Sequence, residues 1–465
     1  MKKTTISLLL AGLTIAGGLG GCTKLTRGFD ENPNTASDAP STLQLTGAQL
    51  AEGLFMSGES ARTANIWAGV FRGADRQYQA LQNYITTTQD YSTPWTIAYQ
   101  SCMTQLRIVE SKATSVGNKQ LTGIAQASEG LMIGTVAALW GDVPYSQAFV
   151  ENTPPTFDAQ ATVYAATQTL LTTAIGNLTA NAGAGASVSA DIFYGGNQFK
   201  WVAAAHSLKA RYYLHVKNYA SALTEAQQGI TSSANDLLMP YAGAVGISAN
   251  PYWDFLNNRT AYLDGVGSYA PTLLLARTNS KTNETARYKY FYNDSDPSIY
   301  SDRDPNWIDG AFQATSSFPL ITYVETQAII AECQARAGNT AAAITALNNL
   351  RAYDASTYTG SGALYTAYVA SDFTPGGVAN PTSSGQTAAA ALLKEVLLEK
   401  YFSLIGQIEE FNDVRRTNNL IGVPINTSTA SALPQRFLYP LVELNTNPNT
   451  PNPVPSLFTK TPVNQ

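Results

Sequence analysis

Apolar side chains recur three and four residues apart over most of the chain, and this spacing predicts a mainly α-helical protein. The pattern begins near Leu43, and stretches rich in Gly, Pro, Asn and Asp interrupt it where turns are expected. The predicted helical segments are residues 42–71, 95–113, 119–141, 161–178, 199–230, 318–353 and 390–416.

Two parts of this pattern resemble each other. Residues 204–230 and 326–352 both have the order helix, short turn, helix, with small Ala side chains where the helices would cross. Such units are typical of tetratricopeptide-like helix pairs. Two units are too few for a solenoid, so we expect them to form a scaffold within a single domain of residues 41–465.

The segment between the two units has a different composition. Residues 232–318 are rich in Asn, Asp, Gly, Pro and Tyr and lack helical periodicity. A structureless loop of this length is uncommon unless it has a function. We therefore expect a large, irregular, loop-rich insertion that faces a ligand.

The N-terminus has the pattern of a targeting signal. Lys2 and Lys3 precede an apolar stretch of roughly fifteen residues, which is short for a membrane span and typical of a signal peptide. Residues 19–22, Leu-Gly-Gly-Cys, resemble the lipobox of bacterial lipoproteins. This predicts a signal peptide at 1–21, lipidation of Cys22 and a turn-rich tether at 22–40; an ordinary cysteine beside a normal cleavage site is the alternative.

The charge content limits the classes of partner, and the cysteine positions indicate the state of the thiols. Without Lys2 and Lys3, 26 Lys and Arg side chains face 33 Asp and Glu side chains, and no basic tract occurs, so we expect no nucleic-acid partner. Charged residues make up 13% of the chain, while Tyr is abundant. Cys102 and Cys333 lie in helical segments and favour small buried thiols, although one disulfide between them is an alternative.

Few residues have the spacing of catalytic or metal sites. Glu325 and Glu332 share one helix face, about 10.5 Å apart along the axis, which is long for the carboxylate pair of a glycosidase. We expect them to be structural and to pair with Arg415, Arg416 or Arg436.

Two other sets of residues carry side chains that can bind metal ions. His206 and His215 point to opposite helix faces, so they cannot form a helical metal pair. Residues 293–304 carry clustered oxygens that calcium could use, but they lack an EF-hand pattern. We expect a turn-rich loop there, and no metal or cofactor.

The sequence Gly-Asp-Val-Pro-Tyr-Ser at 141–146 follows an apolar helix. Gly141 suits a left-handed C-cap, Asp142 can accept from backbone donors in the turn, and Pro144 prevents the helix from continuing. The motif, including Tyr145, therefore predicts a chain reversal.

Aromatic and amide side chains gather in two loop regions, and this mixture suits the apolar faces and hydroxyl rims of sugars. Each aromatic residue could equally belong to the core, so the prediction concerns the two groups and not single members. The first group is Asp75, Arg76, Tyr78, Tyr84, Tyr91 and Trp95; the second is Trp253, Asn258, Arg259, Tyr262 and Trp307.

Several stretches together resemble one family, the SusD/RagB-type lipoproteins of Bacteroidetes. Each stretch is weak by itself, but their order along the chain matches that of the family. They are FDENPNTA (29–36), ALWGDVPYSQAF (138–149), YVETQAIIAECQARAGNTAAAI (323–344), LLEKYFSLIGQIEEFNDVRRTN (397–418) and PQRFLYPLVELNTNPN (434–449).

The resemblance implies a tetratricopeptide-like scaffold and a lipid-anchored, surface-exposed protein of the outer membrane. It implies capture of an oligosaccharide or a peptide and delivery to a SusC-like TonB-dependent transporter, without catalysis. Two alternatives remain: a helical scaffold lipoprotein without a small-molecule ligand, and a glycoside hydrolase. Acidic residues usually follow the lipidated Cys of surface-exported members, whereas Thr23, Lys24 and Leu25 follow it here.

Overall fold

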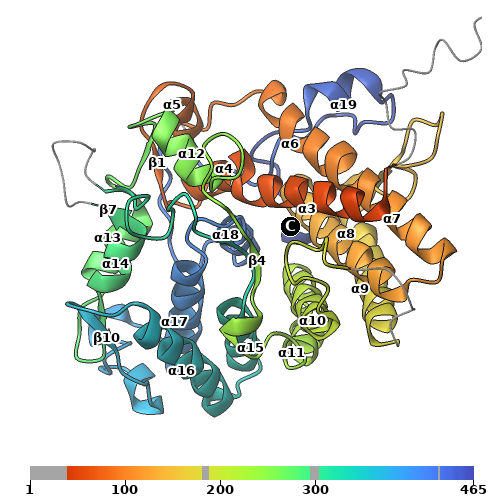
Figure 1. Ribbon diagram of the computed structural model, residues 1–465. Coiled ribbons are helices and arrows are strands. Elements are labelled where there is room, and N and C mark those ends of the chain that lie inside the picture. The colour runs from red at the N-terminus through yellow and green to blue at the C-terminus, as the bar shows by residue number, and fades with distance from the viewer. Residues whose placement is uncertain (1–38, 181–187, 294–302, 428–429) are drawn as a thin grey trace, which may run out of the picture. The chain divides into compact units, whose positions relative to one another are not determined.

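The computed structural model describes residues 39–180, 188–293, 303–427 and 430–465 (Figure 1). The predicted signal peptide, Cys22 and nearly all of the predicted tether lie outside these residues. From Ser41 to Gln465 the chain forms one compact unit. It is mainly helical and tetratricopeptide-like, which confirms the predicted fold class.

The α-helices of the described residues are α3 Ser41–Ser57, α4 Glu59–Trp67, α5 Arg76–Gln82, α6 Ser92–Thr96, α7 Thr104–Ser115, α8 Lys119–Trp140, α9 Gln160–Thr179, α10 Gln198–His215, α11 Tyr219–Ala226, α12 Pro251–Asn258, α13 Tyr269–Ala276, α14 Thr285–Phe291, α15 Tyr323–Arg336, α16 Thr340–Thr357, α17 Ala388–Ser403, α18 Glu409–Arg416 and α19 Leu441–Thr446. Shorter helical turns are η1 Thr88–Tyr91, η2 Ile97–Met103, η3 Ser233–Asn235, η4 Ala370–Phe373, η5 Thr382–Ser384 and η6 Pro462–Asn464.

The strands are short and pair two by two in antiparallel fashion. The pairs are β1 Arg72–Gly73 with β5 Leu263–Asp264, β2 Val143–Pro144 with β3 Phe157–Asp158, β4 Leu237–Met239 with β9 Phe318–Ile321, β6 Thr282–Glu284 with β10 Ala363–Tyr365, and β7 Tyr292–Asn293 with β8 Asp304–Pro305.

One turn recurs in three helix pairs. The turns lie at residues 116–118, 216–218 and 337–339, and they join α7 to α8, α10 to α11, and α15 to α16. The middle residue, Gly117, Lys217 or Gly338, has φ of 71°, 60° or 78°, and an Asn follows it each time. The side chain of Asn118 accepts a hydrogen bond from the Leu121 N–H, as an N-cap does. The pair α7–α8 is thus a third copy, beyond the two pairs that the sequence predicts.

The two predicted helix pairs lie beside each other although residues 227–322 separate them in the sequence (Figure 1). Ala222 of α11 packs in one buried cluster with Ile329 and Cys333 of α15. Cys102 and Cys333 are both buried and both free, which confirms small buried thiols and excludes a disulfide in this structure.

The segment 232–318 is less irregular than its lack of periodicity predicts. It contains α12, α13 and α14, each too short to show a helical period clearly. In α12, Asn250 caps the N-terminus, Pro251 occupies the first turn, and Tyr252 and Phe255 are buried. The predicted helix 318–353 also begins later than expected, because its first four residues form β9 and Thr322 caps α15.

Candidate functional site

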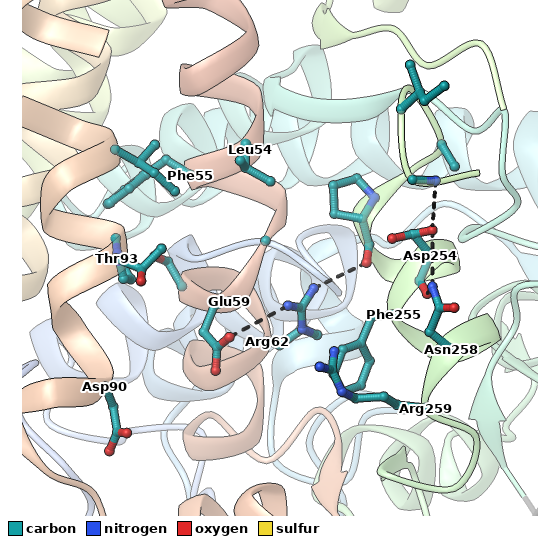
Figure 2. Close-up of a pocket in the computed structure, with 18 of the residues that line it drawn as sticks. Leu54, Phe55, Glu59, Arg62, Asp90, Thr93, Asp254, Phe255, Asn258 and Arg259 are labelled. Atoms are coloured by element: carbon teal, nitrogen blue, oxygen red, sulfur yellow. Dashed lines mark hydrogen bonds and ion pairs between the residues drawn. The ribbon is translucent and has the colours of Figure 1, made fainter. Parts of the chain in front are cut away.

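A cavity of about 640 Å³ lies where the first helices meet α12 (Figure 2). The end of α3 and the start of α4 contribute Leu54, Phe55, Glu59 and Arg62, and η1 contributes Asp90. The opposite wall comes from α12 and the loop before it. Between α3 and α4, Gly58 has the non-helical angles φ −88° and ψ −138°, and it lies too close to the Leu54 carbonyl for a side chain to fit. This break in the predicted helix 42–71 creates one wall of the cavity.

Arg62 lies between the two walls. Its guanidinium donates to the Tyr78 hydroxyl at 2.7 Å and to the Pro251 carbonyl at 3.2 Å, and it stacks 4.4 Å from the centre of the Phe255 ring. Burial alone would lower the pKa of Arg62, but the neighbouring Tyr78 and Glu59 outweigh it and raise the pKa. Arg62 therefore stays charged and fixes α4 to α12.

The groups around Arg62 are polar and partly held in place. Asp254 accepts from the Gly246 N–H at 3.2 Å and from the Asn258 amide at 3.3 Å. Asp90 accepts from the Thr87 N–H at 2.7 Å, which caps η1. Side chains fixed in this way can bond to a ligand without a large loss of conformational freedom.

A smaller apolar cavity of about 220 Å³ adjoins the main one and shares Glu59 and Asp90 with it. Leu81, Ile85 and Phe437 line the smaller cavity. Ile85 is 65% exposed, which is unusual for so large an apolar side chain. A ligand that fills both cavities would meet a polar part and an apolar part.

Among the first predicted group, the aromatic rings serve the core. Tyr78, Tyr84 and Tyr91 are buried, and Trp95 packs 5.3 Å from Trp140. Burial raises the pKa of Tyr78 to about 12. Tyr91 also borders the smaller apolar cavity.

The charged members of that group are exposed. Asp75 caps α5 and lies 3.7 Å from Arg76, whose guanidinium is 5.7 Å from the ring of Tyr262. Asp75, Arg76 and Tyr262 therefore gather beside α12 but outside the lining of the main cavity.

The second predicted group lies closer to the cavity. Asn258 and Arg259 line it, and the Arg259 guanidinium lies 5.6 Å from the Phe255 ring. Trp253 of α12 and Trp307 of the loop after β8 are half-buried and meet edge to face, 6.1 Å apart, outside the lining. The sequence thus located α12 but missed Glu59, Arg62, Asp90 and Asp254. Two sequence features could have located part of this lining, namely the Ser57-Gly58-Glu59 break in the first helix and the Thr87–Asp90 capping pattern.

The predicted carboxylate pair is structural. Glu332 accepts hydrogen bonds from the two terminal guanidinium nitrogens of Arg416 at 2.7 and 2.8 Å, as predicted. Glu325 pairs instead with Arg211 at 2.7 Å, so the prediction of Arg415, Arg416 or Arg436 as its partner is wrong. Its place in the first turn of α15 directs it toward α10, which carries Arg211. Both carboxylates are fully buried and cannot reach a substrate.

Arg415 and Arg436 bind backbone carbonyls instead of carboxylates. Arg415 donates to the carbonyls of Ala138 and Gln435, and Arg436 donates to that of Trp140. The two arginines thus fasten the end of α8 to the segment before α19. Both arginines are buried, so these carbonyls replace the water that would otherwise accept from them.

The Gly-Asp-Val-Pro-Tyr-Ser motif forms the predicted chain reversal. Gly141 ends α8 with φ of 87°, and Pro144 lies in β2. Asp142, which the sequence predicts to accept from backbone donors within the turn, accepts instead from the Gln160 N–H at the start of α9. The hydroxyl of Tyr145 donates to Glu129 at 2.9 Å. The motif therefore joins α8 to α9.

The described residues contain no group of His, Cys, Asp and Glu that could hold a metal ion. Most of the loop considered for calcium, residues 294–302, lies outside them. His206 bonds to Glu225 at 2.7 Å, and His215 bonds to Tyr164 and Glu409. Both histidines therefore hold helices together.

A family profile described as "Starch-binding associating with outer membrane", of the SusD-like type, matches residues 33–440. The chain belongs to the SusD-like family. SusD-like proteins are binding proteins associated with the outer membrane. No curated protein matches the chain. Within the residues that the structure describes, none of the helices is both long enough and apolar enough to cross a bilayer.

Solved structures share the fold of this SusD-like chain. A SusD/RagB family protein from Bacteroides thetaiotaomicron has a TM-score of 0.67 and 20% identity over 89% of this chain and 95% of that one. A SusD homolog from Parabacteroides distasonis has a TM-score of 0.68 and 15% identity over 88% and 94%. A chitin-binding SusD homolog from Flavobacterium johnsoniae has a TM-score of 0.63 and 16% identity over 87% and 93%.

Proposed function

We propose that this protein captures an oligosaccharide at the outer membrane and delivers it to a SusC-like TonB-dependent transporter. The observation that carries the proposal is the 640 Å³ cavity, where amide, hydroxyl and guanidinium groups converge. Pockets of this volume commonly hold small ligands. A chitin-binding relative of the same fold supports a glycan as the ligand.

In this proposal Cys22 carries the lipid that holds the protein at the cell surface, and residues up to Pro40 give it reach. The exposed Arg259 donates to ligand hydroxyls, the side-chain oxygen of Asn258 accepts from them, and the exposed Leu54 and Ile247 offer apolar contacts. Because water competes for each hydroxyl, several such contacts are needed for useful affinity. A peptide is the second candidate, since the Glu59 and Asp254 carboxylates would suit its charged groups.

Two other functions have less support. The carboxylate pair considered for a glycoside hydrolase, Glu325 and Glu332, is buried in ion pairs. A scaffold without a ligand would not need a cavity lined by convergent polar groups, although the helix pairs would suit it.

The test is calorimetric titration of the full chain, purified in detergent, with chitin and starch oligosaccharides and with short peptides. Asn258→Ala and Arg259→Ala should weaken binding about tenfold without changing the melting temperature. Asn257→Ala is the matched control, because Asn257 is exposed on the same helix but does not line the cavity. Trp95→Ala is a poor probe, since the buried ring supports the core.

The partner is tested separately, by purifying the tagged protein from membranes and identifying co-purified proteins. A TonB-dependent transporter together with a bound glycan would support both parts of the proposal. A transporter without any ligand would favour the scaffold, and binding that none of the cavity variants weakens would place the ligand elsewhere.

A further inference from the structure

A second cavity, of about 230 Å³, is lined by residues of α14 and α16 and of the strands β4 and β9. None of its lining residues lines the main cavity. Two carboxylates, Asp236 and Asp354, contribute to its wall. Its aromatic lining residues are Tyr290, Phe291, Phe312, Phe318, Tyr353 and Tyr358.

Asp354 has an oxygen that nothing satisfies. The residue is 1% exposed, and its Oδ2 lies 3.4 Å from a guanidinium nitrogen of Arg287. Its Oδ1 has no hydrogen-bond partner among the residues that the structure describes. A buried acceptor without a donor costs free energy, and such groups are rare in folded proteins. Oδ1 exposes less than 1 Å² of surface, so a ligand in the cavity acts on Asp354 through its charge.

Asp354 also belongs to a buried ion-pair network with an excess of negative charge. We call it the α14–α17 network. It joins three guanidinium groups to four carboxylates: Arg277, Arg287 and Arg351 with Glu284, Asp354, Glu395 and Glu399. Burial raises the pKa of Asp354, and Glu399 and Glu284 add to this while Arg287 opposes it. The network therefore has one carboxylate more than it has cations, and Asp354 takes up a proton more readily than a free Asp does.

The rest of the cavity wall also suits a cation. Asp236 is half-buried and accepts from the Tyr323 N–H at 2.6 Å, which leaves its second oxygen for another donor. The Arg287 guanidinium already lies 5.1 Å from the Tyr358 ring, so this wall holds one cation against an aromatic face. Aromatic rings attract cations through their electron-rich faces, and more strongly away from water.

We propose that this second cavity binds a primary ammonium group. The ammonium donates to the second oxygen of Asp236 and lies near Asp354, and its carbon atoms pack on the aromatic lining. Its positive charge favours the ionised form of Asp354 and so offsets the fourth carboxylate of the α14–α17 network. Two sources carry this chemistry, an amino sugar and an alkylamine such as a lysine side chain. The inference concerns a cavity separate from the proposed oligosaccharide site, so each can fail without the other.

The test is calorimetric titration of the full chain near neutral pH with two matched pairs of probes. Glucosamine and glucose differ at one position by an ammonium in place of a hydroxyl, and butylamine and butanol differ in the same way. We expect each ammonium to bind at least about tenfold more tightly than its neutral partner. Binding of glucosamine alone would identify an amino sugar, and binding of butylamine would identify an alkylamine.

Variants locate the binding. Asp354→Asn and Asp236→Asn should each weaken ammonium binding at least about tenfold, while Glu151→Gln, which changes an exposed carboxylate outside the cavity, should not. Unchanged melting temperatures verify folding. Equal affinity for glucosamine and glucose, no binding up to about 100 mM, or wild-type affinity in both Asp variants would each overturn the proposal.

Discussion

Two buried charge networks in this protein use the same kinds of side chain but differ in their balance. The α15–α18 network joins two carboxylates to three cations: Glu332 and Asp413 with Arg336, Lys400 and Arg416. The α14–α17 network joins four carboxylates to three guanidinium groups. In the first network each carboxylate has two cations, whereas in the second Asp354 shares Arg287 with Glu284 and Glu399.

The balance decides the protonation of the acids. Burial by itself would raise the pKa of Glu332, but Arg416 and the other cations outweigh it and lower the pKa to about 2. In the α14–α17 network burial raises the pKa of Glu284 and of Asp354, whereas at Glu399 the three arginines outweigh burial and lower the pKa. A buried carboxylate that accepts hydrogen bonds from several cations is therefore held ionised, and one with few such bonds takes up a proton more readily.

Of the changes considered, breaking the α15–α18 network should lower the free energy of unfolding most. Arg416→Met removes both hydrogen bonds to Glu332 and leaves a buried carboxylate without its main partner. We expect the free energy of unfolding to fall by about 3–5 kcal/mol. Urea denaturation of the full chain, followed by circular dichroism, measures this.

Arg336→Met is the control, because Arg336 also pairs with Glu332 but its side chain is 22% exposed. A loss below about 1 kcal/mol is expected there. Equal losses in the two variants would show that burial does not set the strength of these ion pairs.

The second largest effect should come from acid, which weakens the α15–α18 network by protonating Glu332. Because the pKa of Glu332 is about 2 in the folded protein and 4.5 ordinarily, its contribution is complete above about pH 4.5 and is lost as the pH falls toward 2. Glu332→Gln should therefore cost about 3 kcal/mol at neutral pH and less in acid. Denaturation of both proteins at several pH values checks this, and a difference independent of pH would contradict it.

The helical scaffold was largely predictable because local sequence encodes it. Apolar spacing located the long helices, and the two similar segments located two helix pairs. The third pair, α7–α8, was missed although its turn at 116–118 has the same Gly-Asn signal as residues 338–339. Its helices differ in composition from the other pairs, so overall similarity hid the shared turn.

The site was less predictable because it depends on contacts between distant segments. Composition pointed to the right loops, but it could not show that Tyr78 and Trp95 turn inward while Asn258 and Arg259 face a cavity. Likewise, helix spacing placed Glu325 and Glu332 on one face, but only the packing of α10 on α15 pairs Glu325 with Arg211.

The smallest expected change in stability comes from the α14–α17 network and has the opposite sign. It tests most directly whether the two networks differ in charge balance. Asp354→Asn keeps the shape of the side chain and removes the excess negative charge, so stability should stay unchanged or rise by up to about 1 kcal/mol. An acid whose pKa is raised on folding stabilises most at low pH and loses that contribution as the pH rises. The advantage of the variant should therefore grow with pH in denaturant titrations. Glu332→Gln, the matched amide replacement in the α15–α18 network, should lose stability under the same neutral conditions. If Asp354→Asn lost as much as Glu332→Gln, Asp354 would be an ionised partner of Arg287, and no charge would remain for an ammonium ligand to neutralise.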